Sequence, residues 1–106
     1  MVDQIATRMG SNIVLLDLTG VTIIADYFII ATADSDRQMR AIAEGIDEQI
    51  KQTYGLDPLA TEGVPSSGWM LIDYGNYVVH LFSEEVRERY QLEQLWHDAK
   101  TLVKLA

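Results

Sequence analysis

The chain has 106 residues, of which 48% are hydrophobic and 23% charged, the composition of an ordinary globular protein of one domain. Sixteen acidic and eight basic residues give a formal net charge of −8, which disfavours direct contact with DNA or RNA and favours a basic protein partner. The chain has no cysteine for a disulfide or thiolate metal site, no apolar run long enough to span a membrane, and no signal or transit pattern at its start. We therefore expect one cytoplasmic domain over residues 1–106.

The first half of the chain predicts a helix, two strands and a long second helix. A short helix over residues 3–10 precedes apolar strands over residues 13–18 and 27–32. Ser35 and Gln38 then form a capping box. The helix that follows, up to Gly55, buries one stripe at helical spacing: Met39, Ile42, Ala43, Ile46 and Ile50.

The second half predicts a short edge strand, a hairpin and a terminal helix. The edge strand lies within residues 56–64, and the hairpin joins strands 69–73 and 77–82 through a turn containing Gly-Asn. Ser83 caps a last helix, whose apolar spacing continues to the end of the chain or breaks near Tyr90 into two short helices.

This order of elements predicts an α/β fold with a single mixed sheet of about five strands packed with helices. Both faces of the last hairpin strand are apolar, since Val79 and Leu81 point one way and Val78 and Phe82 the other. Two helices hardly cover both faces of such a sheet. Either the terminal helix wraps to the far side, or a partner or second copy covers the remaining apolar surface.

The Asp34-Ser35-Asp36 segment after a strand allows two interpretations. Paired carboxylates hold divalent metals in nucleotidyl transfer, but that chemistry also needs a third carboxylate and a phosphate-binding loop. Helix capping by Ser35, with Asp34 and Asp36 at the positive end of the helix dipole, explains the segment fully. We expect no metal and no cofactor here.

The hairpin and the last helix hold the other candidate residues. Asp73 could orient His80 as a base, but no nucleophile is evident beside them, and Arg87 could instead pair with Asp73. Trp69, at the start of a strand, is either core or the anchor of an interface, whereas the helical stripe favours a core position for Trp96.

These residues, taken together, resemble the ribosomal silencing factor family, also called the Iojap family. The resemblance covers nearly the whole chain from Asp17 and is specific because the patterns W-x-x-x-D, V-H-x-F, R-x-x-Y and L-E-x-L-W follow one another in this order. The residues that carry it are Asp26–Thr32, Ser35, Arg37, Glu62-Gly63, Gly68-Trp69, Asp73–Gly75, Val79-His80, Phe82, Arg87, Tyr90, Leu92-Glu93 and Leu95-Trp96.

The resemblance implies a nucleotidyltransferase-like core without catalytic residues, and therefore not an enzyme. It also implies binding to the large ribosomal subunit, through the ribosomal protein numbered fourteen on its intersubunit face. Subunit joining would be blocked sterically and translation repressed under nutrient limitation. A homodimer is implied for the free protein. The alternative is a metal-dependent nucleotidyltransferase using Asp34 and Asp36.

Carried over residue by residue, the resemblance predicts a partner-binding surface led by Trp69. Its expected members are Trp69, Leu71, Asp73, Tyr74, His80, Arg87, Tyr90, Leu92, Glu93 and Trp96.

Overall fold

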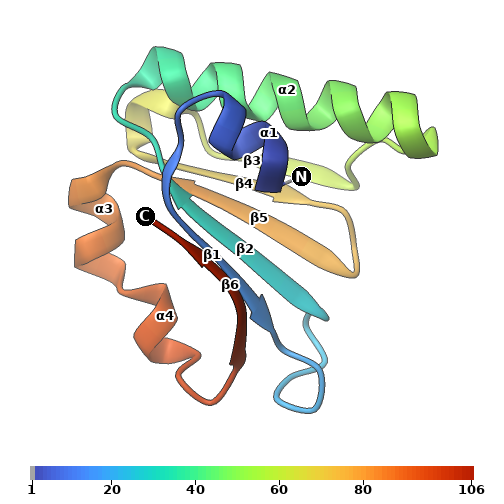
Figure 1. Ribbon diagram of the computed structural model, residues 1–106, viewed down its shortest axis with the longest axis vertical. Coiled ribbons are helices and arrows are strands. Elements are labelled where there is room, and N and C mark those ends of the chain that lie inside the picture. Colours follow the sequence, from blue (N-terminus) through green and yellow to red (C-terminus); the bar gives the residue numbers. More distant parts are fainter. Residues whose placement is uncertain (1) are drawn as a thin grey trace.

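The computed structural model describes residues 2–106, which form one six-stranded sheet with helices on both faces (Figure 1). The strands are β1 (Ser11–Asp17), β2 (Tyr27–Thr32), β3 (Ala60–Glu62), β4 (Trp69–Asp73), β5 (Tyr77–Phe82) and β6 (Lys100–Leu105). The helices are α1 (Val2–Thr7), α2 (Asp36–Tyr54), the short 3-10 helix η1 (Pro65–Ser67), α3 (Glu84–Tyr90) and α4 (Leu92–Leu95). No helix in the described residues is long and apolar enough to cross a membrane.

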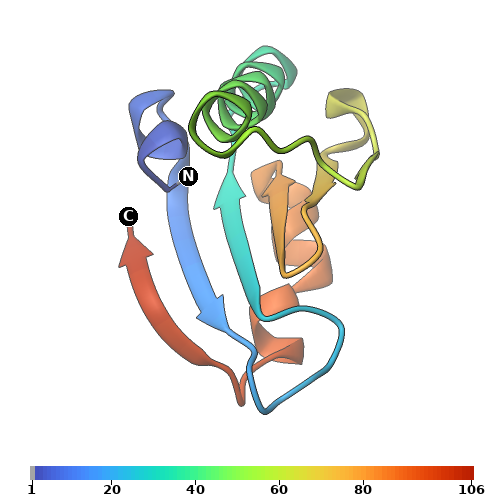
Figure 2. The same ribbon diagram turned by 90° about the vertical axis from the view of Figure 1, so that its right-hand side faces the viewer.

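The strands lie in the order β3-β4-β5-β2-β1-β6. All neighbours are antiparallel except β2 and β5, which run parallel at the centre of the sheet. After β2 the chain crosses one face of the sheet as α2 and returns through β3 and the β4–β5 hairpin (Figure 2). The predicted mixed sheet is confirmed, and its hairpin turns at Gly75, whose φ of 95° suits glycine.

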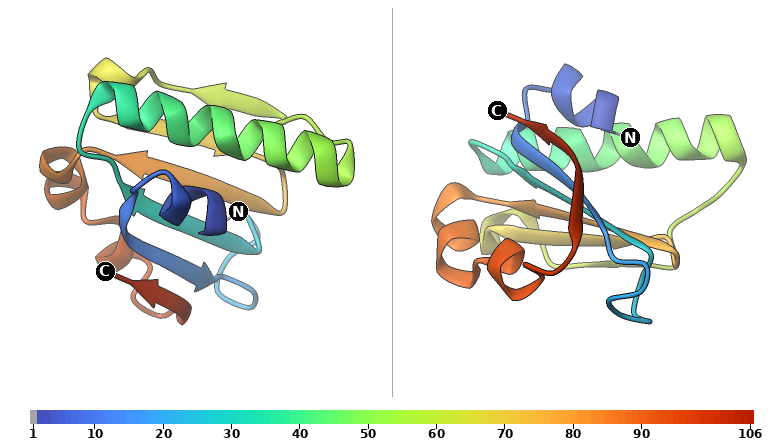
Figure 3. Two further views of the ribbon diagram at one scale, coloured as in Figure 1. Left: turned by 45° about the horizontal axis from the view of Figure 1, so that its top comes forward. Right: turned by 60° about the horizontal axis from the view of Figure 1, so that its bottom comes forward.

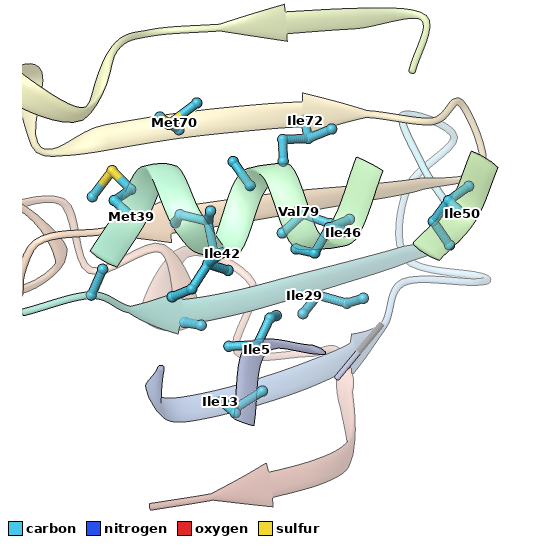
Figure 4. Close-up of a cluster of buried hydrophobic side chains, with 14 residues drawn as sticks. Ile5, Ile13, Ile29, Met39, Ile42, Ile46, Ile50, Met70, Ile72 and Val79 are labelled. Atoms are coloured by element: carbon cyan, nitrogen blue, oxygen red, sulfur yellow. The ribbon is translucent and has the colours of Figure 1, made fainter. Parts of the chain in front are cut away.

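Two separate apolar cores confirm that both faces of the sheet are covered. On one face, α1 and α2 pack against a core that includes Leu81. Figure 4 shows Ile42, Ile46 and Val79 of the same core. On the other face, Val78 and Phe82 join a second core against which α3 and α4 pack. The sheet therefore lies between two helical layers of different extent, with α1 and the long α2 on one side and the short helices α3 and α4 on the other (Figure 3).

A six-residue strand, β6, replaces the predicted end of the terminal helix. Apolar spacing predicted helix up to Val103, but the helical part ends at Leu95 and the chain turns back to pair with β1. Short apolar runs fit helical and extended patterns equally well. Pairing with β1 decides between them, because the backbone groups along the outer side of β1 accept a returning antiparallel strand. The sheet thereby gains a sixth strand beyond the predicted five or so.

The start of α2 is held by the predicted capping residues. The backbone N–H of Gln38 donates to Ser35 Oγ at 3.1 Å, while Gln38 Oε1 accepts from the backbone N–H of Asp34. The Gln38 amide also donates to the carbonyl oxygen of Met9 at 3.0 Å. Gln38 therefore joins the turn after α1 to the start of α2, and the capping box also satisfies free backbone donors.

Ser35→Ala should lower the free energy of unfolding by about 1 kcal/mol, because it removes the side-chain acceptor at the N-cap. Urea unfolding followed by circular dichroism measures this change. Ser66→Ala, an exposed serine in η1, is the matched control and should leave the midpoint unchanged.

Candidate functional site

An aromatic cluster on the α3 side of the sheet brings several of the predicted partner-binding residues together. The ring of Trp69 lies 4.9 Å from that of Phe82 and 5.1 Å from that of Tyr90, between centroids. Trp69 is half-buried and Tyr90 is 54% exposed, so both offer ring surface to solvent. Leu71, two residues along β4, packs against the same core. We call Trp69, Leu71, Val86 and Tyr90 the aromatic platform.

A groove runs beside the aromatic platform, between α3 and the loop after β3. Its volume is about 370 Å³, and its lining consists of Glu62, Gly63, Ser67, Trp69, Leu71, Val86, Arg89 and Tyr90. Gly63 has a φ of 80°, and a Cβ atom there would lie 2.2 Å from the carbonyl oxygen of Trp69. Glycine at position 63 therefore allows the loop to approach β4 and form one wall of the groove.

His80 lies buried beneath the aromatic platform, with 3% of its surface exposed. Its Nδ1 accepts a hydrogen bond from the indole Nε1–H of Trp69 at 3.2 Å, and its ring lies 4.6 Å from that of Phe28. Asp73 is not beside it, since β4 pairs Leu71 with His80 and Asp73 with Val78. The suggestion that Asp73 orients His80 as a base is therefore wrong; the Asp73 carboxylate accepts from the backbone N–H of Gly75 at 2.7 Å.

Burial lowers the pKa of His80 to about 4, against an ordinary value of 6.5. In the unfolded chain, the His80 side chain consequently binds a proton below about pH 6.5. In the folded protein, the same side chain stays neutral down to about pH 4. The stability that His80 contributes is thus present above pH 6.5 and is lost as the pH falls towards 4.

We expect the free energy of unfolding to fall by about 2 kcal/mol from this group between pH 7.5 and pH 5. Urea titrations at several pH values measure the slope. His80→Gln should remove most of it, whereas the equivalent change at the exposed His97 should not. A slope that persists unchanged in His80→Gln would contradict the assignment.

Arg87 ties α3 to three other parts of the fold, and its side chain is only 11% exposed. Its Nη1 donates to the carbonyl oxygen of Asn12 at 2.6 Å and to Thr32 Oγ1 at 2.9 Å, and its Nε donates to Glu93 at 3.0 Å. Its carboxylate partner is therefore Glu93 and not Asp73, which corrects the sequence-based suggestion. Arg87 holds the helical layer against β1 and β2 and links α3 to α4.

The break between α3 and α4 occurs at Gln91, in agreement with the second of the two alternatives, a break near Tyr90. Gln91 takes the left-handed conformation with φ 47°, and its N–H caps α3 by donating to the carbonyl of Arg87. This turn lets Leu92 and Trp96 pack against the sheet, with the ring of Trp96 set edge-on to that of Phe28 at 5.8 Å. The Trp96 side chain is therefore partly buried and packs against the second core from its edge.

Tyr74 lies apart from the aromatic platform. Its ring packs against the α2-side core and stacks on Tyr77, and its hydroxyl donates to the carboxylate of Asp47 in α2 at 2.8 Å. Burial and this hydrogen bond raise its pKa above the ordinary value. A contact with both Trp69 and Tyr74 would need a partner that reaches around the β3 edge or the β4–β5 turn.

Five groove residues were absent from the predicted surface: Glu62, Gly63, Ser67, Val86 and Arg89. Glu62 and Gly63 belong to the family pattern, whereas Val86 and Arg89 lie among the charged residues of α3. Helical spacing places Val86 and Tyr90 one turn apart on a shared side, and this signal could have identified Val86.

The Asp34–Asp36 segment forms a helix start. Both aspartates are exposed, beside the N-cap Ser35. Among the side chains that the structure describes, no three of His, Cys, Asp or Glu are grouped so that they could hold a metal ion. The described residues therefore do not supply the third carboxylate that the nucleotidyltransferase alternative requires.

Comparison with known proteins gives a consistent family. The family model described as "Ribosomal silencing factor during starvation" matches residues 1–105. The Ribosomal silencing factor RsfS of Bacillus subtilis is 39% identical over 92 residues, covering 87% of this chain and 77% of that protein. A crystal structure of a Chromobacterium violaceum protein superposes with a TM-score of 0.84 at 33% identity, covering 99% of this chain and 88% of that one.

A mouse protein named "Mitochondrial assembly of ribosomal large subunit protein 1" is 36% identical over 73 residues, covering 67% of this chain and 32% of its own length. The family match spans nearly the whole sequence, and the structural likeness covers 99% of this chain. The chain therefore belongs to the ribosomal silencing factor family.

Proposed function

We propose that this protein binds the large ribosomal subunit in a bacterial cytoplasm and blocks subunit joining by steric exclusion. The partner would be a basic ribosomal protein on the intersubunit face, namely the large-subunit protein numbered fourteen. Such a factor represses translation under nutrient limitation by affinity and bulk alone, without turnover. The regulatory role itself follows from family membership.

The aromatic platform is the observation that carries this proposal. Trp69 and Tyr90 lie in contact beside a groove, at the outer end of a core and not inside it. Tryptophan and tyrosine are the residues most enriched among those that dominate binding energy at interfaces. A ring pair supported from below and open from above can contribute contact area without further ordering.

The charge around the platform favours a cationic partner. Glu84, Glu85 and Glu88 are exposed on α3, and Glu62 lines the groove. Of the two arginines on α3, Arg87 points into the protein and Arg89 pairs with Glu85 at 3.1 Å. Together with the net charge of −8, this arrangement would steer a basic protein towards the platform and repel exposed RNA phosphate.

Co-sedimentation of the purified protein with isolated large and small ribosomal subunits tests the proposal. We expect binding to the large subunit only, and slower joining of the subunits when the protein is in excess, as measured by light scattering. Equal binding to both subunits, or to neither, would contradict it. If the protein binds the large subunit but the rate of subunit joining is unchanged, the steric mechanism is wrong and only the choice of partner is supported.

The homodimer is a separate proposal, and the opposite side of the sheet offers a surface for it. Next to α2 lies a groove of about 550 Å³ with no charged side chain in its lining: Leu15, Tyr27, Ile29, Ile50, Tyr54, Leu56, Asn76, Tyr77 and Leu102. Two acidic copies would repel each other except where such uncharged surface meets. Sedimentation velocity at several protein concentrations measures the association, and a monomer at all concentrations would refute it.

A further inference from the structure

We propose that His80 is a positioning residue for the docking surface: it accepts the indole N–H of Trp69 and so presents the ring to the partner as a purely apolar face. The inference rests on the proposed function, because it assigns how the Trp69 contact is prepared and what chemistry it accepts.

The hydrogen bond defines the orientation of both rings. Trp69 Nε1 can only donate, so Nδ1 of His80, at 3.2 Å, must be the unprotonated acceptor nitrogen. The His80 proton therefore sits on Nε2, which has no hydrogen-bond partner in the described residues. The tautomer of His80 is thus set by Trp69, and the plane of the indole is set in turn by the fixed acceptor beneath it.

The acceptor is fixed because the His80 ring is enclosed by other rings. Phe28 lies edge-on at 4.6 Å and Phe82 lies nearly parallel at 6.1 Å, and the histidine is on the central strand β5. Rotation of an enclosed, 3% exposed ring would require displacing these neighbours. An indole bonded to such a ring loses little conformational freedom on binding, since it is already ordered in the free protein.

This arrangement has a consequence for the partner. The single polar atom of Trp69 is used inside the protein, so a partner group placed on Trp69 needs no hydrogen-bond acceptor. The exposed indole surface, with the Tyr90 ring beside it, would best accept an aliphatic stem or a guanidinium lying on the ring face. Lysine and arginine side chains of a basic ribosomal protein have both features.

Two substitutions of His80 separate its acceptor role from its packing role. His80→Asn places an amide oxygen near the position of Nδ1, because both atoms are bonded to Cγ. His80→Gln keeps an amide of similar polarity but moves it one bond further, towards the position of Nε2. His97→Gln, at the exposed histidine, is the control.

The first measurement is made on the free protein by NMR. The chain has two tryptophans, so the Trp69 indole N–H can be assigned with a Trp96→Phe variant. We expect slow solvent exchange of this proton in the wild type and in His80→Asn, and fast exchange in His80→Gln. Fast exchange in the wild type would overturn the inference even if no variant folded.

The second measurement is the affinity of each variant for purified bacterial large ribosomal subunits. His80→Gln should bind about fivefold to tenfold more weakly, the equivalent of one lost hydrogen bond, while His80→Asn and His97→Gln should stay near the wild type. Equal affinity of His80→Gln and the wild type, both folded by circular dichroism, would overturn the positioning role. A wild type that does not bind would refute the proposed function, whereas the exchange rates would still report on the hydrogen bond.

Discussion

Trp69→Ala is expected to weaken binding to the large ribosomal subunit by about 30-fold to 100-fold, as for a central aromatic residue of an interface. The substitution removes the ring that contacts Phe82 and Tyr90 and forms a wall of the groove. Because the ring is half-buried at the margin of the second core, the domain should stay folded with reduced stability. Co-sedimentation at increasing protein concentration measures the affinity.

Tyr54→Ala is the matched control, since Tyr54 is an aromatic residue 66% exposed at the end of α2, in the groove on the other side of the sheet. It should leave large-subunit binding unchanged. Loss of the far-ultraviolet circular dichroism of Trp69→Ala at room temperature would show that Trp69 is required for folding. If a folded Trp69→Ala variant binds the large subunit as tightly as the wild type, the aromatic platform is not part of the interface.

Arg87→Met is expected to lower the free energy of unfolding by about 3 kcal/mol. The change keeps an apolar stem but removes every donor, so the carbonyl of Asn12 and the hydroxyl of Thr32 lose their charged partner. It also leaves Glu93 without its cation beside a partly buried site. Urea unfolding gives the stability, and hydrogen exchange should show the largest loss of protection in α3 and α4.

Arg89→Met provides the comparison within the same helix. The pair between Arg89 and Glu85 is exposed, with 61% and 83% of the two side chains accessible, so its loss should change stability by less than about 0.5 kcal/mol. Similar effects of the two substitutions would mean that the contacts of Arg87 contribute no more than a surface ion pair. Weaker subunit binding by Arg87→Met at full folding would show that α3 must be held in place for docking.

The loss of affinity in Trp69→Ala and the loss of stability in Arg87→Met both concern the α3–α4 side of the sheet, but they arise from different contacts. Trp69 and Tyr90 offer contact surface, while Arg87 holds the helix that carries Tyr90 against β1 and β2. Leu92 and Trp96 close the layer after the turn at Gln91. The α3–α4 side of the sheet is thus a thin, two-helix cover whose exposed margin is aromatic, and this margin is the surface we assign to the partner.

Local patterns in the sequence were sufficient for most of the elements. Ser35, Gln38 and Gly55 delimit α2 because capping depends on nearby backbone groups, and the alternation through Val78 and Phe82 shows a strand buried on both faces. The short helix break at Gln91 and the hairpin turn at Gly75 are likewise local. The family pattern then singled out Trp69, His80 and Arg87 by type and spacing, without showing what each contacts.

Contacts between distant segments were decided by the tertiary structure alone. The strand over residues 100–105 pairs with β1, which lies some 85 residues earlier in the chain. The apolar pattern within these six residues cannot show that β1 is available as a pairing partner. In the same way, strand register places His80 opposite Leu71 and beneath Trp69, while Arg87 meets Asn12 and Glu93 instead of Asp73. Residue types thus determined which groups needed a partner, and the folded sheet, by bringing its strands into register, determined which partner each one found.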